Sequence, residues 1–184
     1  MFDVPQMFES ATLFDTPAGL CGLSWSAAGL TRVRPFAASP AKAVKPGAAL
    51  IPEAEAPAHI TATIAALRAF LAGEPVRFDD TVLDFSGLSE FEAALYRALR
   101  SVGWGETVSY GELARRIGAD TGAARAVGIA MGRNPWPLIV PCHRVLTSDG
   151  KLGGFSAPGG AASKAALLAR EGVHFDGGQL ALFE

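Results

Sequence analysis

The chain places one of its two cysteines, Cys142, directly before His143 in the apolar run Ile139–Val145. A cysteine reacts as its thiolate, and a nearby base or positive charge helps the thiolate to form. Neighbouring side chains often diverge, so the fold must supply the geometry, and a water molecule could relay the proton. In a cysteine hydrolase a third group would orient the histidine, and Glu171 or Asn134 could serve. Alternatively, Cys142 is a small buried hydrophobic residue with an inert thiol.

The composition predicts a globular protein of one large or two small domains. Of the 184 residues, 49% are hydrophobic, which is ample for a buried core. No apolar run approaches the roughly 18 residues that cross a bilayer, and the N-terminus lacks a basic start followed by an apolar block. We therefore expect a cytoplasmic protein with no membrane contact.

The cysteines and histidines show no spacing typical of a disulfide framework or a metal site. Cys21 and Cys142 lie far apart, and His59, His143 and His174 are scattered along the chain. Zinc ligands usually come as closely spaced pairs. We expect free thiols, no bound metal and no other cofactor.

The charge distribution is uneven although the net charge is only −2. Residues 97–170 contain 10 Lys and Arg but only four acidic residues, Glu106, Glu112, Asp120 and Asp149. A local basic face matters more for phosphate contact than the total charge does. The second half of the chain is therefore the candidate for nucleic-acid binding.

The first half has the pattern of a small α/β domain, which we place at residues 1–86. Apolar runs at 11–15, 20–26 and 30–36, separated by turn signals, predict an antiparallel meander. Residues 37–58 are rich in Ala and Pro and predict a loop. A helix packed on the meander is then indicated by apolar residues at helical spacing, namely Ile60, Ile64, Leu67, Phe70 and Leu71.

The second half, residues 87–184, predicts a mostly helical domain. Residues 89–92 form a capping box that opens a helix with Phe91, Leu95, Leu99 and Val102 on one face. Ser109 can cap a helix over 110–117, and Asp120 or Thr121 can cap another that runs to about residue 131. Two short helices joined by a Gly-containing turn are typical of a helix-turn-helix. A Gly-rich loop at 153–160 precedes a last helix over 161–170.

The helix that follows Asp120 carries one long cation, Arg125, among small residues. The small residues are Gly122, Ala123, Ala124, Ala126, Gly128 and Ala130. Their lack of bulk would let the backbone approach a DNA groove, or would let the helix pack tightly on another helix. The pattern alone favours neither interpretation.

Residues 91–172 resemble one family closely, the methylated-DNA–protein-cysteine methyltransferases that repair O6-alkylguanine. Residues 1–88 match it only weakly. The resemblance rests on four blocks, which are Val108–Ala114, Ala123–Gly128, Gly132–Pro135 and Ile139–Val145. It implies a monomeric, single-turnover repair protein that binds alkylated double-stranded DNA in the minor groove. The protein would flip the damaged nucleotide out of the duplex and move the alkyl group from guanine, or from O4-alkylthymine, to a cysteine.

The resemblance also implies catalytic roles for five residues. Cys142 matches the alkyl acceptor, His143 the residue that deprotonates it through a bridging water, and Glu171 the residue that orients the histidine. Tyr110 matches the tyrosine that helps to rotate the nucleotide and then donates a proton or hydrogen bond to the leaving guanine. Asn134 matches an asparagine that braces the active-site turn.

Further positions match residues that contact DNA or line the pocket. Arg125 matches the finger that fills the gap in the base stack. The other DNA-contacting candidates are Tyr110, Ala124, Ala126, Gly128 and Arg144. The pocket candidates are Pro137, Val145, Phe155, Ser156 and Lys164. Lys164 could instead be a solvated helix residue.

The chain departs from the family in two places. Phe155 stands where some relatives have tyrosine, so a hydroxyl is lost from the pocket wall. Some relatives hold zinc in the N-terminal domain, and Cys21 alone cannot rebuild such a site. The competing functions are a damage sensor without chemistry, a transcription regulator and a cysteine hydrolase. The acceptor cysteine argues against the sensor, and the small residues beside Arg125 argue against readout of major-groove base edges.

Overall fold

The computed structural model describes residues 9–176 and 179–180, and the chain divides into two compact units. The N-terminal unit comprises Met1–Ala72 and Asp80–Ser86, and the C-terminal unit comprises Gly73–Asp79 and Gly87–Glu184. Within the described residues, no helix is both long and apolar enough to span a bilayer.

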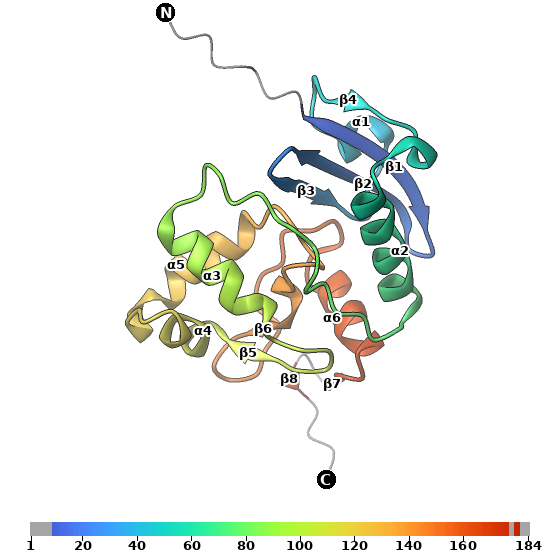
Figure 1. The fold of residues 1–184 in the computed structure, drawn as a ribbon. Coiled ribbons are helices and arrows are strands. Elements are labelled where there is room, and N and C mark those ends of the chain that lie inside the picture. Colours follow the sequence, from blue (N-terminus) through green and yellow to red (C-terminus); the bar gives the residue numbers. More distant parts are fainter. Residues whose placement is uncertain (1–8, 177–178, 181–184) are drawn as a thin grey trace, which may run out of the picture. The chain divides into compact units, whose positions relative to one another are not determined.

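The N-terminal unit is built on a four-stranded sheet with the order β3-β2-β1-β4 (Figure 1). Strands β1 (Ser10–Thr16), β2 (Gly19–Ser26) and β3 (Gly29–Arg34) form the predicted antiparallel meander. The short β4 (Ala49–Leu50) adds to the edge, parallel to β1. The sheet is therefore mixed rather than purely antiparallel.

Helix α2 (Ala58–Ala72) packs against the sheet and closes the core of this unit (Figure 1). All five apolar residues that predicted it are buried, with exposed fractions of 2% or less. Burial of such a stripe supplies most of the stability of a short helix. The predicted small α/β layer is confirmed.

The prediction of a loop over residues 37–58 is wrong in part. This stretch contains α1 (Pro40–Ala43), β4 and a 3-10 turn (Glu53–Glu55). Helix α1 lies on β2 where Gly22 has no side chain, because a Cβ there would lie 2.1 Å from the carbonyl oxygen of Ala43. This contact joins residues distant in sequence, so no local pattern could reveal it.

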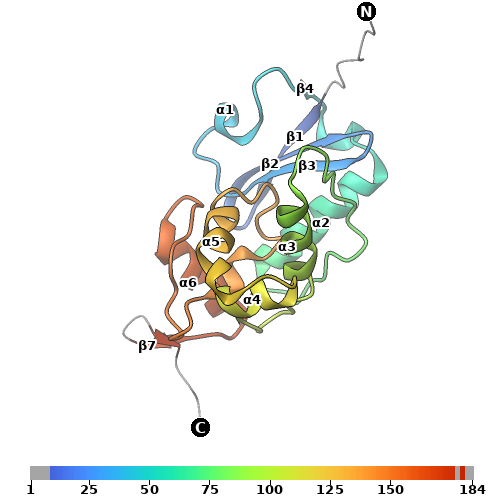
Figure 2. The same ribbon diagram turned by 90° about the vertical axis from the view of Figure 1, so that its left-hand side faces the viewer.

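The C-terminal unit is mostly helical, as predicted, and its helices α3, α4 and α5 lie together (Figure 2). Helix α3 (Glu90–Arg100) begins at a complete capping box between Ser89 and Glu92. Helix α4 (Tyr110–Arg116) begins where the side chain of Ser109 accepts a hydrogen bond from the amide of Glu112. A 3-10 turn (Thr121–Ala123) then leads into α5 (Ala124–Gly132).

A short strand pair brings the helix-turn-helix and the cysteine segment together. Strand β5 (Val108–Ser109), directly before α4, pairs in parallel with β6 (Val145–Leu146), directly after the turn that carries Cys142. Helix α6 (Gly160–Arg170) follows, and β7 (Phe175–Asp176) and β8 (Gln179–Leu180) form a terminal hairpin. The β5–β6 pair therefore determines which end of α4 lies near the cysteine.

Candidate active site

The turn that presents Cys142 is held by backbone hydrogen bonds and by Asn134. The amide of Cys142 donates to the carbonyl of Val140 at 2.8 Å. The Asn134 side chain donates from Nδ2 to the same carbonyl at 2.8 Å, and its Oδ1 accepts from the amide of Trp136 at 3.0 Å. Leu138 has a φ of 78°, which non-glycine residues rarely adopt unless the surroundings enforce it. Asn134 is thus placed to brace the turn.

Cys142 lies at the wall of a cavity of about 360 Å³, within the range of about 300–1,000 Å³ typical of small-molecule sites. Of the predicted pocket residues, Phe155 and Ser156 line it. Met131 lines it too, although it was not predicted, because nothing in a sequence shows which face of a short helix meets a cavity. The full lining is Tyr110, Gly128, Met131, Gly132, Cys142, Gly154, Phe155 and Ser156.

Three predicted pocket residues, Val145, Pro137 and Lys164, do not line this cavity. Val145 is fully buried, and it contributes its backbone carbonyl, which accepts a hydrogen bond from Lys164. Pro137 forms an isolated backbone bridge with Val140 and is absent from the cavity wall. The prediction that Val145 and Pro137 line the cavity is therefore wrong.

Lys164 is fully buried behind Tyr110, which rules out a solvated helix position. Its ammonium donates to the carbonyl of Val145 at 2.6 Å and to that of Leu152. It also lies 5.9 Å from the centre of the Tyr110 ring, within the range of a cation–π contact. Burial lowers the pKa of Lys164 to about 8. This lysine supplies positive charge near Cys142 without lining the cavity itself.

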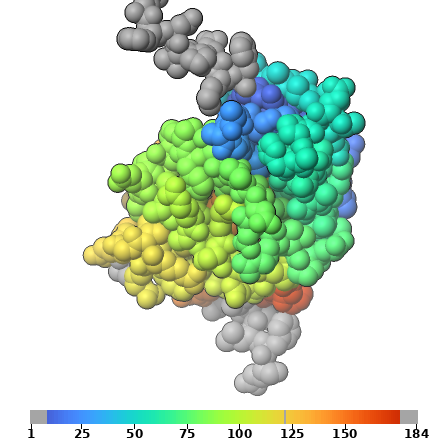
Figure 3. Space-filling model, viewed as in Figure 1, coloured from blue at the N-terminus to red at the C-terminus, as the bar shows by residue number. Residues whose placement is uncertain are grey.

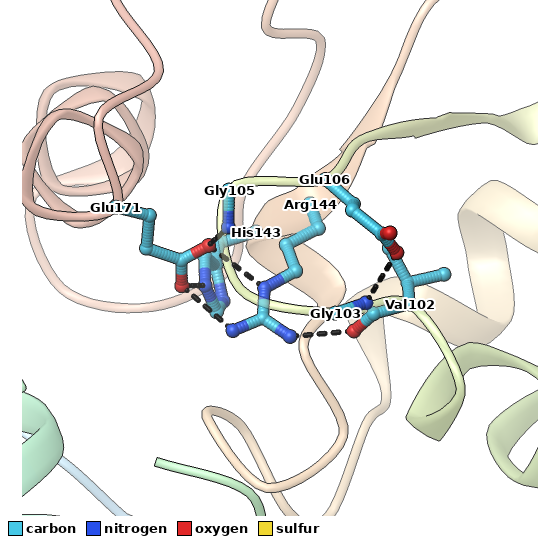
Figure 4. Close-up of polar contacts among 7 residues, drawn as sticks. All are labelled: Val102, Gly103, Gly105, Glu106, His143, Arg144 and Glu171. Atoms are coloured by element: carbon cyan, nitrogen blue, oxygen red, sulfur yellow. Dashed lines mark hydrogen bonds and ion pairs between the residues drawn. The ribbon is translucent and has the colours of Figure 1, made fainter. Parts of the chain in front are cut away.

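His143 and Glu171 form a buried pair across 28 residues of sequence (Figure 4). The distance from Nε2 of His143 to Oε1 of Glu171 is 2.7 Å, and both side chains are fully buried. Because Nε2 is engaged with the carboxylate, Nδ1 is the ring nitrogen that would take a proton from the cysteine. The pair expected from the resemblance is therefore assembled.

Arg144 does not face solvent, so the prediction that it contacts DNA is wrong. Only 6% of its surface is exposed. Its Nε and Nη2 donate to the two oxygens of Glu171 at 2.8 and 2.9 Å, and its Nη1 donates to the carbonyl of Val102 at 2.6 Å. The guanidinium is buried and hydrogen-bonded, and it neutralises the Glu171 carboxylate.

The protonation states follow from burial and from these contacts. Burial raises the pKa of the Cys142 thiol, against opposing effects of a hydrogen bond from Asn134 and the charge of Lys164. Burial lowers the pKa of His143 although Glu171 opposes this. Burial alone would raise the pKa of Glu171, but hydrogen bonds from His143 and Arg144 lower it to about 2. The resting site therefore pairs a thiol with a neutral imidazole.

Helix α5 exposes one face of the C-terminal unit to solvent (Figure 3, yellow). Arg125 and Ala126 are exposed, Ala124 is partly exposed, and Gly128 faces the cavity. Ile129, one helical turn after Arg125, is 52% exposed and was not predicted to matter. The opposite face, with Val127, Ala130 and Met131, is buried.

Metal ligands do not gather in the part of the chain that the structure describes: no group of three His, Cys, Asp or Glu side chains lies close enough to hold an ion. Both cysteines are free thiols.

This chain is similar in sequence to known proteins. The family described as 6-O-methylguanine DNA methyltransferase, DNA binding domain, matches residues 90–173. A methylated-DNA–protein-cysteine methyltransferase of Mycolicibacterium paratuberculosis is 48% identical over 120 residues, which cover 65% of this chain and 70% of that relative. A Thermus thermophilus DNA base-flipping protein is 46% identical over 52% of this chain and 63% of its own length.

The fold agrees as well. The structure of Mycobacterium tuberculosis OGT in complex with DNA matches with a TM-score of 0.70 and 38% identity, over 89% of this chain and 93% of that one. The resemblance drawn from the four sequence blocks is confirmed, and the chain belongs to the methylated-DNA–protein-cysteine methyltransferase family.

Proposed function

We propose that this protein repairs DNA by moving an alkyl group from O6 of guanine, or O4 of thymine, to Sγ of its own Cys142. The observation that carries the proposal is the position of Cys142 at the wall of a cavity, directly before His143 of the buried His143–Glu171 pair. A sensor that only binds damaged DNA needs the cavity, but it needs neither a thiol nor a residue that accepts a proton. A base and an acceptor thiol at one cavity are the requirements of nucleophilic transfer.

The reaction is an in-line displacement. His143 accepts the thiol proton through a bridging water, and the thiolate of Cys142 attacks the alkyl carbon. A sulfur–carbon bond forms as the carbon–oxygen bond breaks, and the electron pair of the broken bond stays on the base. Tyr110, whose pKa is raised by burial, keeps its proton at neutral pH and can donate it or a hydrogen bond to the leaving base. The thioether is stable, so each molecule acts once.

The alkylated nucleobase reaches Cys142 by leaving the duplex. Extrusion costs a few kcal/mol of stacking and pairing, which the cavity and an inserted side chain offset. Arg125 projects from the exposed face of α5 and would fill the vacated space, with Ala126 allowing the helix to approach the minor groove. A lesion-directed protein needs phosphate contacts rather than base readout. In this proposal the protein acts as a monomer in the cytoplasm.

Intact-protein mass spectrometry tests the proposal. After incubation with a duplex that carries one O6-methylguanine, the protein should gain one methyl group, which peptide mapping should place on Cys142. The variant Cys142→Ala should bind the same duplex and gain nothing. A wild-type protein that binds the lesion with no change in mass would instead act as a damage sensor.

A further inference from the structure

The carboxylate of Glu171 receives four hydrogen bonds, and only one of them comes from the histidine (Figure 4). Its Oε1 accepts from His143 and from Nη2 of Arg144, at 2.7 and 2.9 Å. Its Oε2 accepts from Nε of Arg144 and from the amide of Gly105, at 2.8 and 3.2 Å. With both oxygens engaged from two sides, the carboxylate has little freedom to rotate.

Arg144 also ties this carboxylate to the loop that follows α3. Its Nη1 donates to the carbonyl of Val102 at 2.6 Å, and the amide of Gly103 donates to Glu106 at 2.7 Å (Figure 4). Gly105 has a φ of 74°, and a Cβ there would lie 3.0 Å from the carbonyl oxygen of Glu171. The loop therefore lies against both the backbone and the carboxylate of Glu171, and the guanidinium of Arg144 links the carboxylate to the loop.

We infer that Arg144 is a positioning residue for alkyl transfer: its guanidinium holds the Glu171 carboxylate in the orientation in which Oε1 accepts a hydrogen bond from Nε2 of His143. This inference rests on the proposed function. It follows that the proton of the neutral imidazole stays on Nε2 and that Nδ1 is presented as the base. Arg144 acts through Glu171 and does not touch the substrate.

The guanidinium also sets the charge balance around the imidazole. The ionisable groups that face His143 are Glu171, Arg144, Lys164 and Cys142. Because Arg144 neutralises Glu171, a proton added to His143 would make this buried cluster more positive, which is unfavourable. Without Arg144, the bare carboxylate would raise the pKa of His143 and so favour the imidazolium, which cannot accept the thiol proton.

The N-terminal unit offers a matched control. Arg68 also donates to both oxygens of a glutamate, Glu53, through Nη1 and Nη2 at 2.5 and 2.8 Å, but this pair is more than one third exposed. Replacing either arginine by lysine keeps the charge and removes the planar fork. Arg144→Lys and Arg68→Lys therefore make the same chemical change inside and outside the proposed network.

The first test measures the transfer rate of Arg144→Lys with saturating O6-methylguanine duplex, together with DNA affinity and thermal unfolding. We expect the rate to fall about tenfold, because one ammonium cannot hold both carboxylate oxygens, while DNA affinity stays at the wild-type value. Nitrogen NMR of the His143 ring should show the proton on Nε2 in the wild type and a mixture of tautomers in the variant. Arg68→Lys should behave as wild type in all these measurements.

The second test is the pH profile of Arg144→Gln. The acid limb of the rate should move to higher pH by about 1–2 units, because the pKa of His143 rises when its positive neighbour is removed. If this variant does not fold, the rate and the tautomer of Arg144→Lys decide alone. An unchanged rate together with a single tautomer in Arg144→Lys would overturn the inference. So would an acid limb that does not move in a folded Arg144→Gln, or a variant that loses only DNA affinity. A wild-type protein that transfers no methyl group would instead contradict the proposed function.

Discussion

The two cysteines of this protein are almost equally buried, yet only one lies in a reactive setting. Cys21 in β2 is 1% exposed, and Cys142 is 6% exposed. Burial raises the pKa of both thiols. Neither exposure nor this common effect of burial separates them, so the difference must lie in their neighbours.

Those neighbours differ in kind. The sulfur of Cys21 lies 3.9 Å from Oγ1 of Thr16, and a backbone hydrogen bond from Phe36 and the charge of Arg68 also lower the pKa of its thiol. Cys142 has a cavity on one side, the charge of Lys164 nearby and His143 next in the chain. A positive charge acts on both thiols, so Cys142 becomes a nucleophile because the fold adds a base and room for a substrate.

The largest expected effect comes from replacing each sulfur by oxygen. Cys142→Ser should lower the methyl-transfer rate about 10³-fold or more, because a serine hydroxyl is a weak nucleophile without strong activation. Cys21→Ser should transfer at the wild-type rate. Single-turnover assays with O6-methylguanine duplex compare the two variants. Equal losses in both would mean that the neighbours do not distinguish the cysteines.

Removal of the base should have the next largest effect. His143→Gln should slow the transfer by about 10²–10⁴-fold at neutral pH, the usual contribution of a general base. The loss should shrink at alkaline pH, where solvent can deprotonate Cys142 directly. A rate profile across pH, with DNA binding measured in parallel, checks this. A variant slowed equally at every pH would indicate that His143 serves packing instead.

Removal of the Lys164 charge should have a smaller effect on the transfer rate and a measurable effect on the free energy of unfolding. Lys164→Met should slow transfer by about tenfold at neutral pH, because the thiolate loses a favourable charge. The folded pKa of Lys164 is about 8, below its ordinary value of 10.5, so the charged form is disfavoured in the folded state. Wild-type stability should therefore rise relative to Lys164→Met between about pH 8 and 10.5. Urea unfolding across this pH range measures the free energy of unfolding of both proteins. A constant difference between the wild type and Lys164→Met would refute the prediction.

The smallest effect concerns stability alone. Cys21→Ser should lower the free energy of unfolding by about 1–2 kcal/mol, because a smaller and more polar hydroxyl replaces a thiol that is 1% exposed. Chemical denaturation measures this value, and the transfer rate of the folded variant serves as the control. A slowed transfer in Cys21→Ser would show that the N-terminal sheet does more than support its own core.

The sequence by itself determined the features that depend on local pattern. The apolar residues that predicted α2, the capping box at Ser89 and the cap at Ser109 are all found in the structure. These succeed because helix caps and amphipathic spacing act within a few residues. The four motif blocks likewise indicated the family and pointed to Cys142, because they are stretches of chain rather than contacts across it.

Only the tertiary structure decided where the long polar side chains point. Arg144, adjacent in sequence to the reactive pair, turns inward to Glu171, and Lys164 on α6 is buried against the carbonyls of Val145 and Leu152. The elements within residues 37–58 also depend on distant partners, as the contact of α1 with Gly22 shows. The direction of a flexible side chain depends on which distant groups can satisfy its charge once water is excluded, and spacing along the chain carries no record of those partners.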